Sequence, residues 1–441
     1  MSRHHVIVGS GIAALSAAES IRHADAQARI TMVSPEPLPF YSRPGLAYLL
    51  TDEVPESRLA IRTPAEVRAL QLIHRPRTAT VLLPDRHCVI LDDGERLEYD
   101  RLLIATGASS IRPTFPGGDL DGVVQLDALS EARSLVARCR DARAAIVVGG
   151  GSTALELVEG LHARGVATHY LLRGERYWSK VFDRVESAIV ESRLLADGIQ
   201  LHRGCGVEAA VGEDGRLTAI LTTTGRRIEC DILAVATGVR PRLELATSGG
   251  VETARGVLVN EFLESSAPDV FAAGDVAQVQ DPVTRQAHLD TLWASARRQG
   301  SVAGMNMAGM HVAYRTRPPM NVTRVGGITA TIIGAVGGAD DPDLLTLTRG
   351  QSERWAADPE SWSVGGARRG DRLRVVVSGR AIVGALVMGD QELSRPLAHL
   401  IGEEVDISAL RPALEQSPED AMDLLLDFCH AHVSDRAARH W

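Results

Sequence analysis

Short apolar runs alternate with helical patterns along the first part of the chain. The run Val6–Val8 ends at Gly9, and an alanine-rich stretch follows in which apolar residues recur at helical spacing. The apolar run Arg29–Val33 comes after this stretch. Because a strand, a glycine turn, a helix and a second strand follow one another, the pattern predicts a parallel βαβ unit.

The same order of elements returns in the middle of the chain. The run Ala145–Val148 ends at Gly149, a helical pattern covers Thr153–Arg164, and a further apolar run covers Ala167–Leu172. The two units form a large-scale internal repeat. The chain is therefore predicted to have an α/β fold with two Rossmann-like dinucleotide-binding domains.

Both turns have the spacing Gly-x-Gly-x-x-Ala, which suits a bound dinucleotide. The first glycine permits a tight turn, the second lets the backbone approach a pyrophosphate, and the small third residue lets the helix pack on the strand. The helix N-terminus adds free N–H groups and the positive end of its dipole. A single turn of this kind also occurs in structural loops, but two in the same context predict two bound dinucleotides. The residues expected there are Gly9, Gly11, Ala14, Gly149, Gly151 and Ala154.

The second strand of such a unit usually ends in an acidic residue that binds a ribose. In the first unit Ser34 stands at this place, and Glu36 follows two positions later. Glu36 is therefore the expected substitute for the acid.

Further apolar runs end in residues that a flavin site would use. One run ends at Thr106-Gly107, a second ends at Gly238, and a third places Gly274 and Asp275 at a strand end. A carboxylate at this last position can accept a hydrogen bond from a ribityl hydroxyl of a flavin. Each motif alone is common, but their order along one chain indicates a flavoprotein.

A helical pattern covers residues 292–309 and includes Trp293 near its start. Its N-terminus is expected to point at the flavin ring. A positive helix end at that position would stabilise the anionic reduced flavin.

With these motifs in this order, the chain resembles the FAD/NAD(P)-dependent pyridine nucleotide–disulfide oxidoreductase superfamily. Its stretch Pro39–Leu50, PFYSRPGLAYLL, is most similar to the branch that holds ferredoxin and rubredoxin reductases and the flavin portion of nitrite reductases. The resemblance implies that Arg43 lies near the FAD phosphates and Pro44 against the isoalloxazine ring. Other branches of the superfamily carry their redox cysteines at this position, but the stretch here contains no cysteine. Electrons are therefore expected to leave directly from the flavin.

The second turn is expected to hold the nicotinamide nucleotide, since the first belongs to FAD by its place in the chain. Leu172 stands where relatives that use NAD carry an acid, and Arg173 and Arg176 follow it. Arginines can pair with a 2′-phosphate, which favours NADPH. The alternative is that they form a solvated edge and that Glu175 is the acid, which favours NADH. The resemblance also implies that Glu156 faces the nicotinamide, although it is equally compatible with a surface position on the helix.

The composition changes after residue 319, where the resemblance implies an α+β interface domain that covers the flavin or builds a homodimer. Strands are expected over Thr323–Ile333, Arg372–Ser378 and Ile382–Met388, the last two joined as a hairpin. The polar segment 337–370 is expected to be a long loop or lid pinned by its tryptophans, Trp355 and Trp362.

An amphipathic helix is expected over 418–432, with Ser417 as a possible N-cap. The predicted domains are 1–115 and 243–318 for FAD, 116–242 for NAD(P)H, and 319–441 for the interface domain.

Composition and charge limit the setting in which this chemistry takes place. The net charge of −9 includes no basic block, which argues against nucleic acid as a partner. No apolar run approaches the roughly 18 residues of a membrane span, and the early first strand leaves no room for a signal peptide. The five cysteines lack the spacing of a metal site or a disulfide framework, so a reducing, cytoplasmic location is expected.

The sequence thus predicts a FAD-dependent oxidoreductase that passes a hydride from NAD(P)H to the flavin and then electrons to a separate acceptor. The first hypothesis for the acceptor is a ferredoxin- or rubredoxin-type protein. A rival is an NAD(P)H oxidase or a reductase of oxygen, a quinone or a sulfur compound. A third is a flavoprotein whose reduction changes its binding partners, as in relatives of apoptosis-inducing factor. No side chain is predicted to be catalytic and no metal is expected; His288 is a candidate acid or base only by its place before the flavin-side helix.

Overall fold

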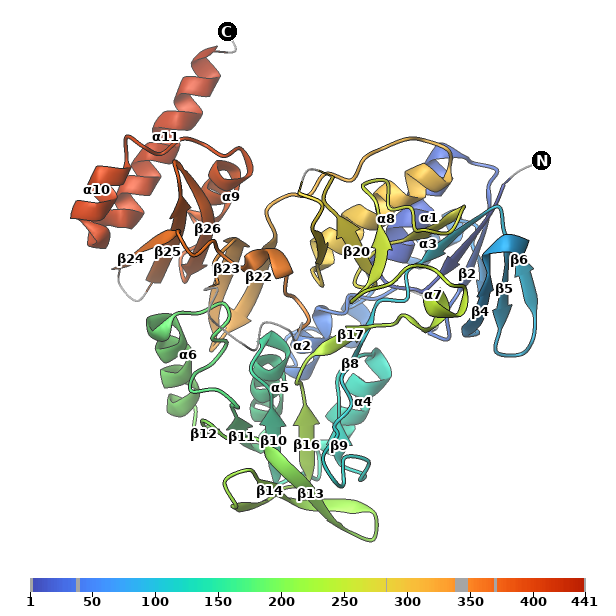
Figure 1. Cartoon of the computed structure of the whole chain (residues 1–441). Helices are drawn as coiled ribbons and strands as arrows, with labels where there is room; N and C mark the ends of the chain where they lie inside the picture. The colour runs from blue at the N-terminus through green and yellow to red at the C-terminus, as the bar shows by residue number, and fades with distance from the viewer. Residues whose placement is uncertain (1–2, 37–39, 283, 338–347, 369–370, 440–441) are drawn as a thin grey trace.

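The computed structural model describes residues 3–36, 40–282, 284–337, 348–368 and 371–439. It has the predicted α/β fold, with two Rossmann-like units and a C-terminal α+β region (Figure 1). The first unit is drawn in blue and yellow, the second in green, and the C-terminal region in orange and red. In the parts of the chain that the structure describes, no helix is long and apolar enough to cross a membrane.

The first unit is built on a five-stranded sheet whose strands are all parallel. Its interior strands are continuous apolar runs because helices and a second layer bury both of their faces. The last strand comes from far along the chain, so residues near 270 complete a sheet begun at residue 4. The strand order is β19 (Val270–Ala272), β7 (Arg101–Ile104), β1 (His4–Val8), β2 (Arg29–Val33) and β3 (Ile73–Arg75).

Two helices, α1 (Ile12–Ala24) and α8 (Trp293–Met307), pack closely beside this sheet. The contact is a backbone contact, because a Cβ at Gly300 would lie 2.1 Å from the carbonyl oxygen of Ala13. The alanine-rich composition of α1 and the glycines of α8 therefore serve close packing of the two helices.

The second unit repeats this plan with a five-stranded parallel sheet. Helix α5 (Ser152–Ala163) follows the second glycine turn, and a small antiparallel sheet covers the opposite face. The order of the parallel strands is β12 (Gln200–His202), β11 (Ala167–Leu171), β10 (Ala144–Val148), β16 (Ile232–Val235) and β9 (Val123–Val124). The covering sheet contains β13 (Val207–Glu213), β14 (Arg216–Thr222) and β15 (Arg227–Glu229).

The C-terminal region is an antiparallel sheet with helices packed on one side (Figure 1). The hairpin predicted near residue 379 is confirmed, since Ser378 pairs with Ala381. The strand order is β22 (Met320–Val325), β23 (Ile328–Gly334), β26 (Ala381–Met388), β25 (Asp371–Ser378) and β24 (Trp362–Arg368). The helices are α9 (Ser394–Gly402), α10 (Arg411–Gln416) and α11 (Ala421–Arg439).

Three expectations for this region were wrong in part. The run predicted as one strand over 323–333 is two strands, because Gly326 and Gly327 have φ of 55° and 72° and form a turn between them. The segment predicted as a loop over 337–370 contains the edge strand β24, although residues 338–347 lie outside the described part. Ser417 makes no side-chain capping hydrogen bond within the described ranges.

A buried ion pair joins the C-terminal sheet to the second unit. Arg374 of β25 donates hydrogen bonds to both carboxylate oxygens of Glu186, at 2.8 and 3.0 Å. Glu186 lies on α6 (Arg184–Ala196), and burial raises the pKa of its carboxyl while Arg374 opposes that rise. Trp355 is also buried, with its ring 6.3 Å from that of Trp178. The C-terminal region is therefore fixed to the second unit, and Trp355 acts as the expected pin.

Candidate functional site

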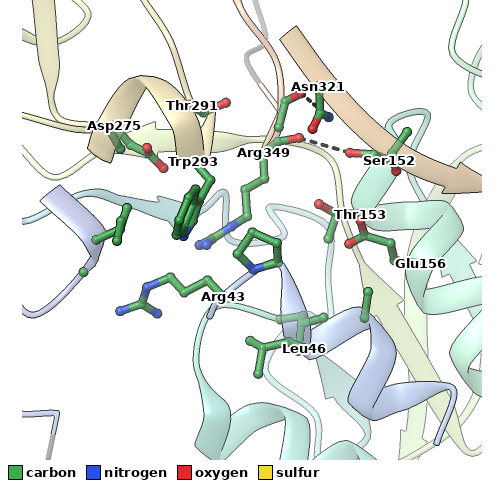
Figure 2. Close-up of a pocket in the computed structure, with 18 of the residues that line it drawn as sticks. Arg43, Leu46, Ser152, Thr153, Glu156, Asp275, Thr291, Trp293, Asn321 and Arg349 are labelled. Atoms are coloured by element: carbon green, nitrogen blue, oxygen red, sulfur yellow. Dashed lines mark hydrogen bonds between the residues drawn. The ribbon is translucent and has the colours of Figure 1, made fainter. Parts of the chain in front are cut away.

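A cavity with about 1510 Å³ of empty space, part of it open to solvent, lies where the three regions meet (Figure 2). Its wall is formed by the first glycine turn, by α2 (Gly45–Leu50), and by parts of α5, α8 and β22. Residues from all three regions therefore face one space. The sequence-predicted site residues that line it are Gly11, Arg43, Pro44, Gly107, Glu156, Gly274, Asp275 and Trp293.

The first glycine turn leaves its helix N-terminus open to this cavity. Gly9 has φ of 128°, and a Cβ there would lie 2.1 Å from the carbonyl oxygen of Ala105, so no side chain fits. Gly11 caps α1 without a side-chain hydrogen bond, and no described atom lies within 4 Å of its Cβ position. Free N–H groups at a helix N-terminus beside open space suit a pyrophosphate. Ala14 is fully buried behind the turn.

Glu36 and Arg43, which were predicted as separate contacts, are paired with each other. The guanidinium of Arg43 lies 2.7 Å from a carboxylate oxygen of Glu36 and also donates to the carbonyl of Asp127 at 2.7 Å. The hydroxyl of Tyr41 donates to the other oxygen of Glu36 at 2.8 Å, and burial raises the pKa of Tyr41 to about 12. Arg43 lines the cavity, whereas Glu36 does not line it and contacts Arg43 through the ion pair.

The wall next to the first sheet carries Asp275 and Trp293. Asp275 follows β19, and burial raises the pKa of its carboxyl while Arg349 and Arg43 oppose the rise. The backbone N–H of Gly274 donates to Gln299 of α8 at 2.7 Å, which fixes the end of the strand. Trp293 begins α8 and is 37% exposed. Figure 2 shows Asp275, Trp293 and Arg349 around the same space.

The second glycine turn has a similar backbone but a different cover. Gly149 has φ of 152°, and a Cβ there would lie 2.3 Å from the carbonyl oxygen of Ala236. Gly151 lies under residues 348–350, which we call the covering segment, because its Cβ position is 2.8 Å from the hydroxyl oxygen of Thr348. The hydroxyl of Ser152 donates to the carbonyl of Arg349 at 3.1 Å (Figure 2). Gly151 is therefore covered, whereas Ser152 and Thr153, which follow it, line the cavity.

Several other residues predicted for the site are not part of the cavity wall. Ala154 is fully buried, and Gly238 lines a small hollow together with Arg349. The hydroxyl of Thr106 donates to the carbonyl of Arg242 at 3.0 Å. His288 lies in the short strand β21 (Ala287–Leu289), and the cavity wall does not include it in the described ranges.

Two glutamates one turn apart on α5, Glu156 and Glu159, line the cavity on the side of the second unit. Burial raises the pKa of Glu156 to about 7, helped by repulsion from Glu159 and opposed by Arg349. Burial likewise raises the pKa of Glu159 to about 7, although the N–H of Gly327 and the charge of Arg324 oppose it. These carboxyls are therefore poised to take up or release protons near neutral pH.

The residues predicted to select the nucleotide lie at the end of β11, away from the cavity wall. Leu172 is buried, with 1% exposure, whereas Arg173 and Glu175 are exposed. Arg176 is half-buried and donates to the carbonyl of Ser179 at 3.4 Å. The positions fit the outer, ribose end of a nucleotide whose other end enters the cavity.

Arg349, a cavity residue from the C-terminal region, was not predicted from the sequence. Its guanidinium lies 2.5 Å from a carboxylate oxygen of Asp127, which is 222 positions away. In the sequence Arg349 is one of several arginines in a polar segment, and nothing in the pattern distinguishes it. Its place depends on contacts between distant parts of the chain.

These observations agree with a FAD site on the first unit. The open helix N-terminus at Gly11 and the cation Arg43 suit phosphates, and the buried carboxyl of Asp275 suits a ribityl hydroxyl. The apolar faces of Pro44 and Trp293 suit an aromatic ring.

Comparison with known proteins agrees with this assignment. A model of the pyridine nucleotide-disulphide oxidoreductase family matches residues 3–300. The NADH oxidase of Methanocaldococcus jannaschii is 26% identical over 436 residues, which cover 97% of this chain and 94% of that protein. The rubredoxin-NAD(+) reductase of Pseudomonas putida is 28% identical over 334 residues, covering 75% and 86%.

A solved structure shows the same fold over most of the chain. The ferredoxin reductase of Rhodopseudomonas palustris superposes with a TM-score of 0.82 at 21% identity, covering 92% of this chain and 96% of that one. The resemblance predicted from the sequence motifs is thus confirmed by the family match and by the fold. The chain belongs to the pyridine nucleotide-disulphide oxidoreductase family, as a flavin-dependent enzyme that exchanges electrons with a nicotinamide nucleotide.

Proposed function

We propose that the chain passes electrons from NAD(P)H through FAD to a separate ferredoxin- or rubredoxin-type protein. The observation that carries this proposal is the single cavity lined both by Gly11 of the first turn and by Glu156 of the second helix. A flavin and a nicotinamide that enter from opposite sides would meet there. The rubredoxin-NAD(+) reductase similarity supports a redox protein as the acceptor.

Bound FAD would accept two electrons from the nicotinamide and release them to the acceptor, while the protein supplies position and electrostatics. In this proposal the N-terminus of α1 and Arg43 bind the phosphates, and Asp275 accepts a hydrogen bond from the ribityl chain. Pro44 and Trp293 exclude water from the ring, and Glu156 orients the nicotinamide.

We further propose that NADPH is the preferred nucleotide. Leu172 fills the place of the usual acid, and the exposed Arg173 and the half-buried Arg176 follow it, so a 2′-phosphate would meet two cations there, with the exposed Glu175 between them in the chain. If Glu175 binds the ribose hydroxyls in their stead, NADH is preferred.

The second candidate is a reductase of oxygen, a quinone or a sulfur compound. It is favoured by the carboxyls of Glu156 and Glu159, whose pKa values of about 7 allow proton transfer into the cavity. Reduction of such small molecules consumes protons, whereas electron transfer to an iron–sulfur protein does not require them. The similarity to an NADH oxidase supports this candidate.

The test is anaerobic stopped-flow reduction of the FAD-loaded protein with NADPH and with NADH over a concentration series. We expect fast bleaching by NADPH, and a loss of that preference in Arg173→Gln and Arg176→Gln. Arg184→Gln, a change at an exposed arginine of α6, serves as the matched control. If neither nucleotide bleaches the flavin, the proposed function is wrong. Steady NADPH consumption in air without a protein partner would favour the second candidate.

A further inference from the structure

Two arginines of the C-terminal region, Arg324 and Arg349, line the cavity, and Arg349 is the one beside Trp293. The side chain of Arg349 is 20% exposed and that of its partner Asp127 is 14% exposed, so the pair is largely removed from water. Figure 2 shows the guanidinium directed into the space beside Trp293. Charges in such a place act strongly because little solvent screens them.

The position of Arg349 is fixed by hydrogen bonds from three other parts of the fold. The hydroxyl of Thr291, just before α8, donates to the carbonyl of Thr348 at 2.7 Å. The side chain of Asn321 in β22 donates to the carbonyl of Gly350 at 3.0 Å, and Ser152 of α5 donates to Arg349 itself. The backbone that carries the guanidinium is thus held on both sides and in the middle.

Asp127 holds the guanidinium but does not use all of its donors. Asp127 also accepts hydrogen bonds from the N–H and the hydroxyl of Ser110, at 2.8 and 2.5 Å, so its charge is shared among several donors. The Nε of Arg349 is buried and has no hydrogen-bond partner among the described residues. A buried donor without a partner is unfavourable, and an acceptor on a bound ligand would satisfy it.

The charge of Arg349 acts on both sides of the cavity. It opposes the burial that raises the pKa of Asp275, which belongs to the first unit. It likewise opposes the burial that raises the pKa of Glu156, which belongs to the second. Figure 2 shows Arg349 between Asp275 and Trp293 on one side and Glu156 on the other.

We propose that Arg349 contacts the bound flavin ring and raises the reduction potential of FAD. The inference rests on the proposed place of FAD in this cavity. Reduction adds negative charge to the ring, and a cation held in a partly dry site stabilises that charge. Asp127 is then a positioning residue that holds Arg349 and, by its own charge, lowers the potential. The C-terminal region thereby becomes part of the redox centre.

The experiment is a photometric titration of the FAD-loaded protein against a reference dye, with xanthine and xanthine oxidase as the reductant. No nicotinamide nucleotide is present, so the result is independent of the nucleotide and the acceptor. For Arg349→Gln we expect the ratio of reduced to oxidised flavin at a fixed dye potential to fall at least tenfold. For a two-electron couple this corresponds to about 30 mV. Arg354→Gln is the matched control, because Arg354 donates to the carbonyl of Arg317 outside the cavity wall.

Asp127→Asn provides the decisive comparison, because it should shift the ratio in the opposite direction, toward reduced flavin. A purely structural role of the pair would shift both variants in the same direction. Equal ratios in Arg349→Gln and the parent protein, or an equal shift in Arg354→Gln, would overturn the inference. If Arg349→Gln does not fold, Arg349→Met, which also removes the charge, is measured in its place, and an unchanged ratio there would also overturn it. Failure of the parent protein itself to bind FAD would instead refute the proposed function.

Discussion

The two glycine-rich turns have similar backbones but different surroundings. Gly9 and Gly149 both adopt positive φ, and each abuts a carbonyl of the neighbouring strand. Beyond them the units diverge, because Gly11 faces open space whereas Gly151 lies under Thr348. The turn motif thus fixes the joint between strand and helix, while the rest of the fold decides whether a ligand can reach it.

The helices that follow the turns differ in the same way. Ser16 of α1 is buried, and Glu19 forms an ion pair with Arg62 at 2.6 Å. The residues at the same distances from the second turn are Glu156 and Glu159, which line the cavity. Close packing of α8 covers one face of α1, whereas α5 turns ionisable groups toward the shared space. A repeated motif therefore does not imply a repeated function for its helix.

The largest expected effect tests what the two turns share. Both glycines have a positive φ. A Cβ added by Gly9→Ala would lie 2.1 Å from a backbone carbonyl oxygen, and one added by Gly149→Ala would lie 2.3 Å from another. Each change should lower the free energy of unfolding by about 3 kcal/mol or more. Urea unfolding of the protein without cofactor measures both. If the free energy of unfolding falls by less than about 1 kcal/mol in either variant, the two turns do not share the same steric need for glycine.

The pH dependence of stability tests how the two helices differ. The pKa of Glu159 rises from 4.5 to about 7 on folding, so its contribution to stability is complete below about 4.5 and is lost as the pH rises through 7. Glu159→Gln should therefore lose about 2 kcal/mol less stability than the parent protein between pH 5 and pH 8. Urea midpoints at both pH values measure the difference.

Glu19→Gln is the control for this experiment, because Glu19 holds the equivalent place on α1. It removes an ion pair at the partly exposed Arg62, which contributes at most about 1 kcal/mol. Equal pH dependence in Glu159→Gln and the parent protein would mean that the glutamate of α5 is not shielded from water.

A smaller effect tests the cover of the second turn. Gly151→Ala places a Cβ 2.8 Å from the hydroxyl of Thr348 and should destabilise the protein by about 1 kcal/mol. Gly11→Ala meets no described atom within 4 Å and should change stability by less than about 0.5 kcal/mol. Thermal unfolding of both variants, and of Gly151→Ala combined with Thr348→Ala, checks the contrast. No recovery in the double variant would exclude Thr348 as the cause.

The smallest effect concerns nucleotide binding at the covered turn. Asn321→Ala removes a hydrogen bond that holds the covering segment, which contributes about 0.5–1 kcal/mol. If NAD(P)H has to displace this segment in order to bind, the change makes displacement easier and lowers the Kd for NADPH about two- to fivefold. Titration of the FAD-loaded protein by flavin fluorescence measures it. Thr323→Ala, on the same strand and cavity wall, is the matched control. A weaker or unchanged affinity in Asn321→Ala would mean that the segment stays in place.

Much of the fold followed from local pattern. The strand predicted over Arg29–Val33 has these bounds in the structure, and the predicted helix near Trp293 is α8. Buried parallel strands are continuous apolar runs, and their turns need particular backbone conformations, so both leave a local signal. The edge strand β24 was missed because its two glycines interrupt that signal, and the turn at Gly326-Gly327 was hidden within an apolar run.

The two turn-and-helix units could be predicted from the chain alone, because each depends on residues close together in the chain. The contacts of Asp127 with Arg349 and of Thr348 with Gly151 could not be predicted in this way and are known from the folded structure. These pairs join segments about two hundred positions apart, as the 222 positions between Asp127 and Arg349 show. Contacts of that kind leave no periodicity or spacing in the sequence, since they depend on how whole domains pack.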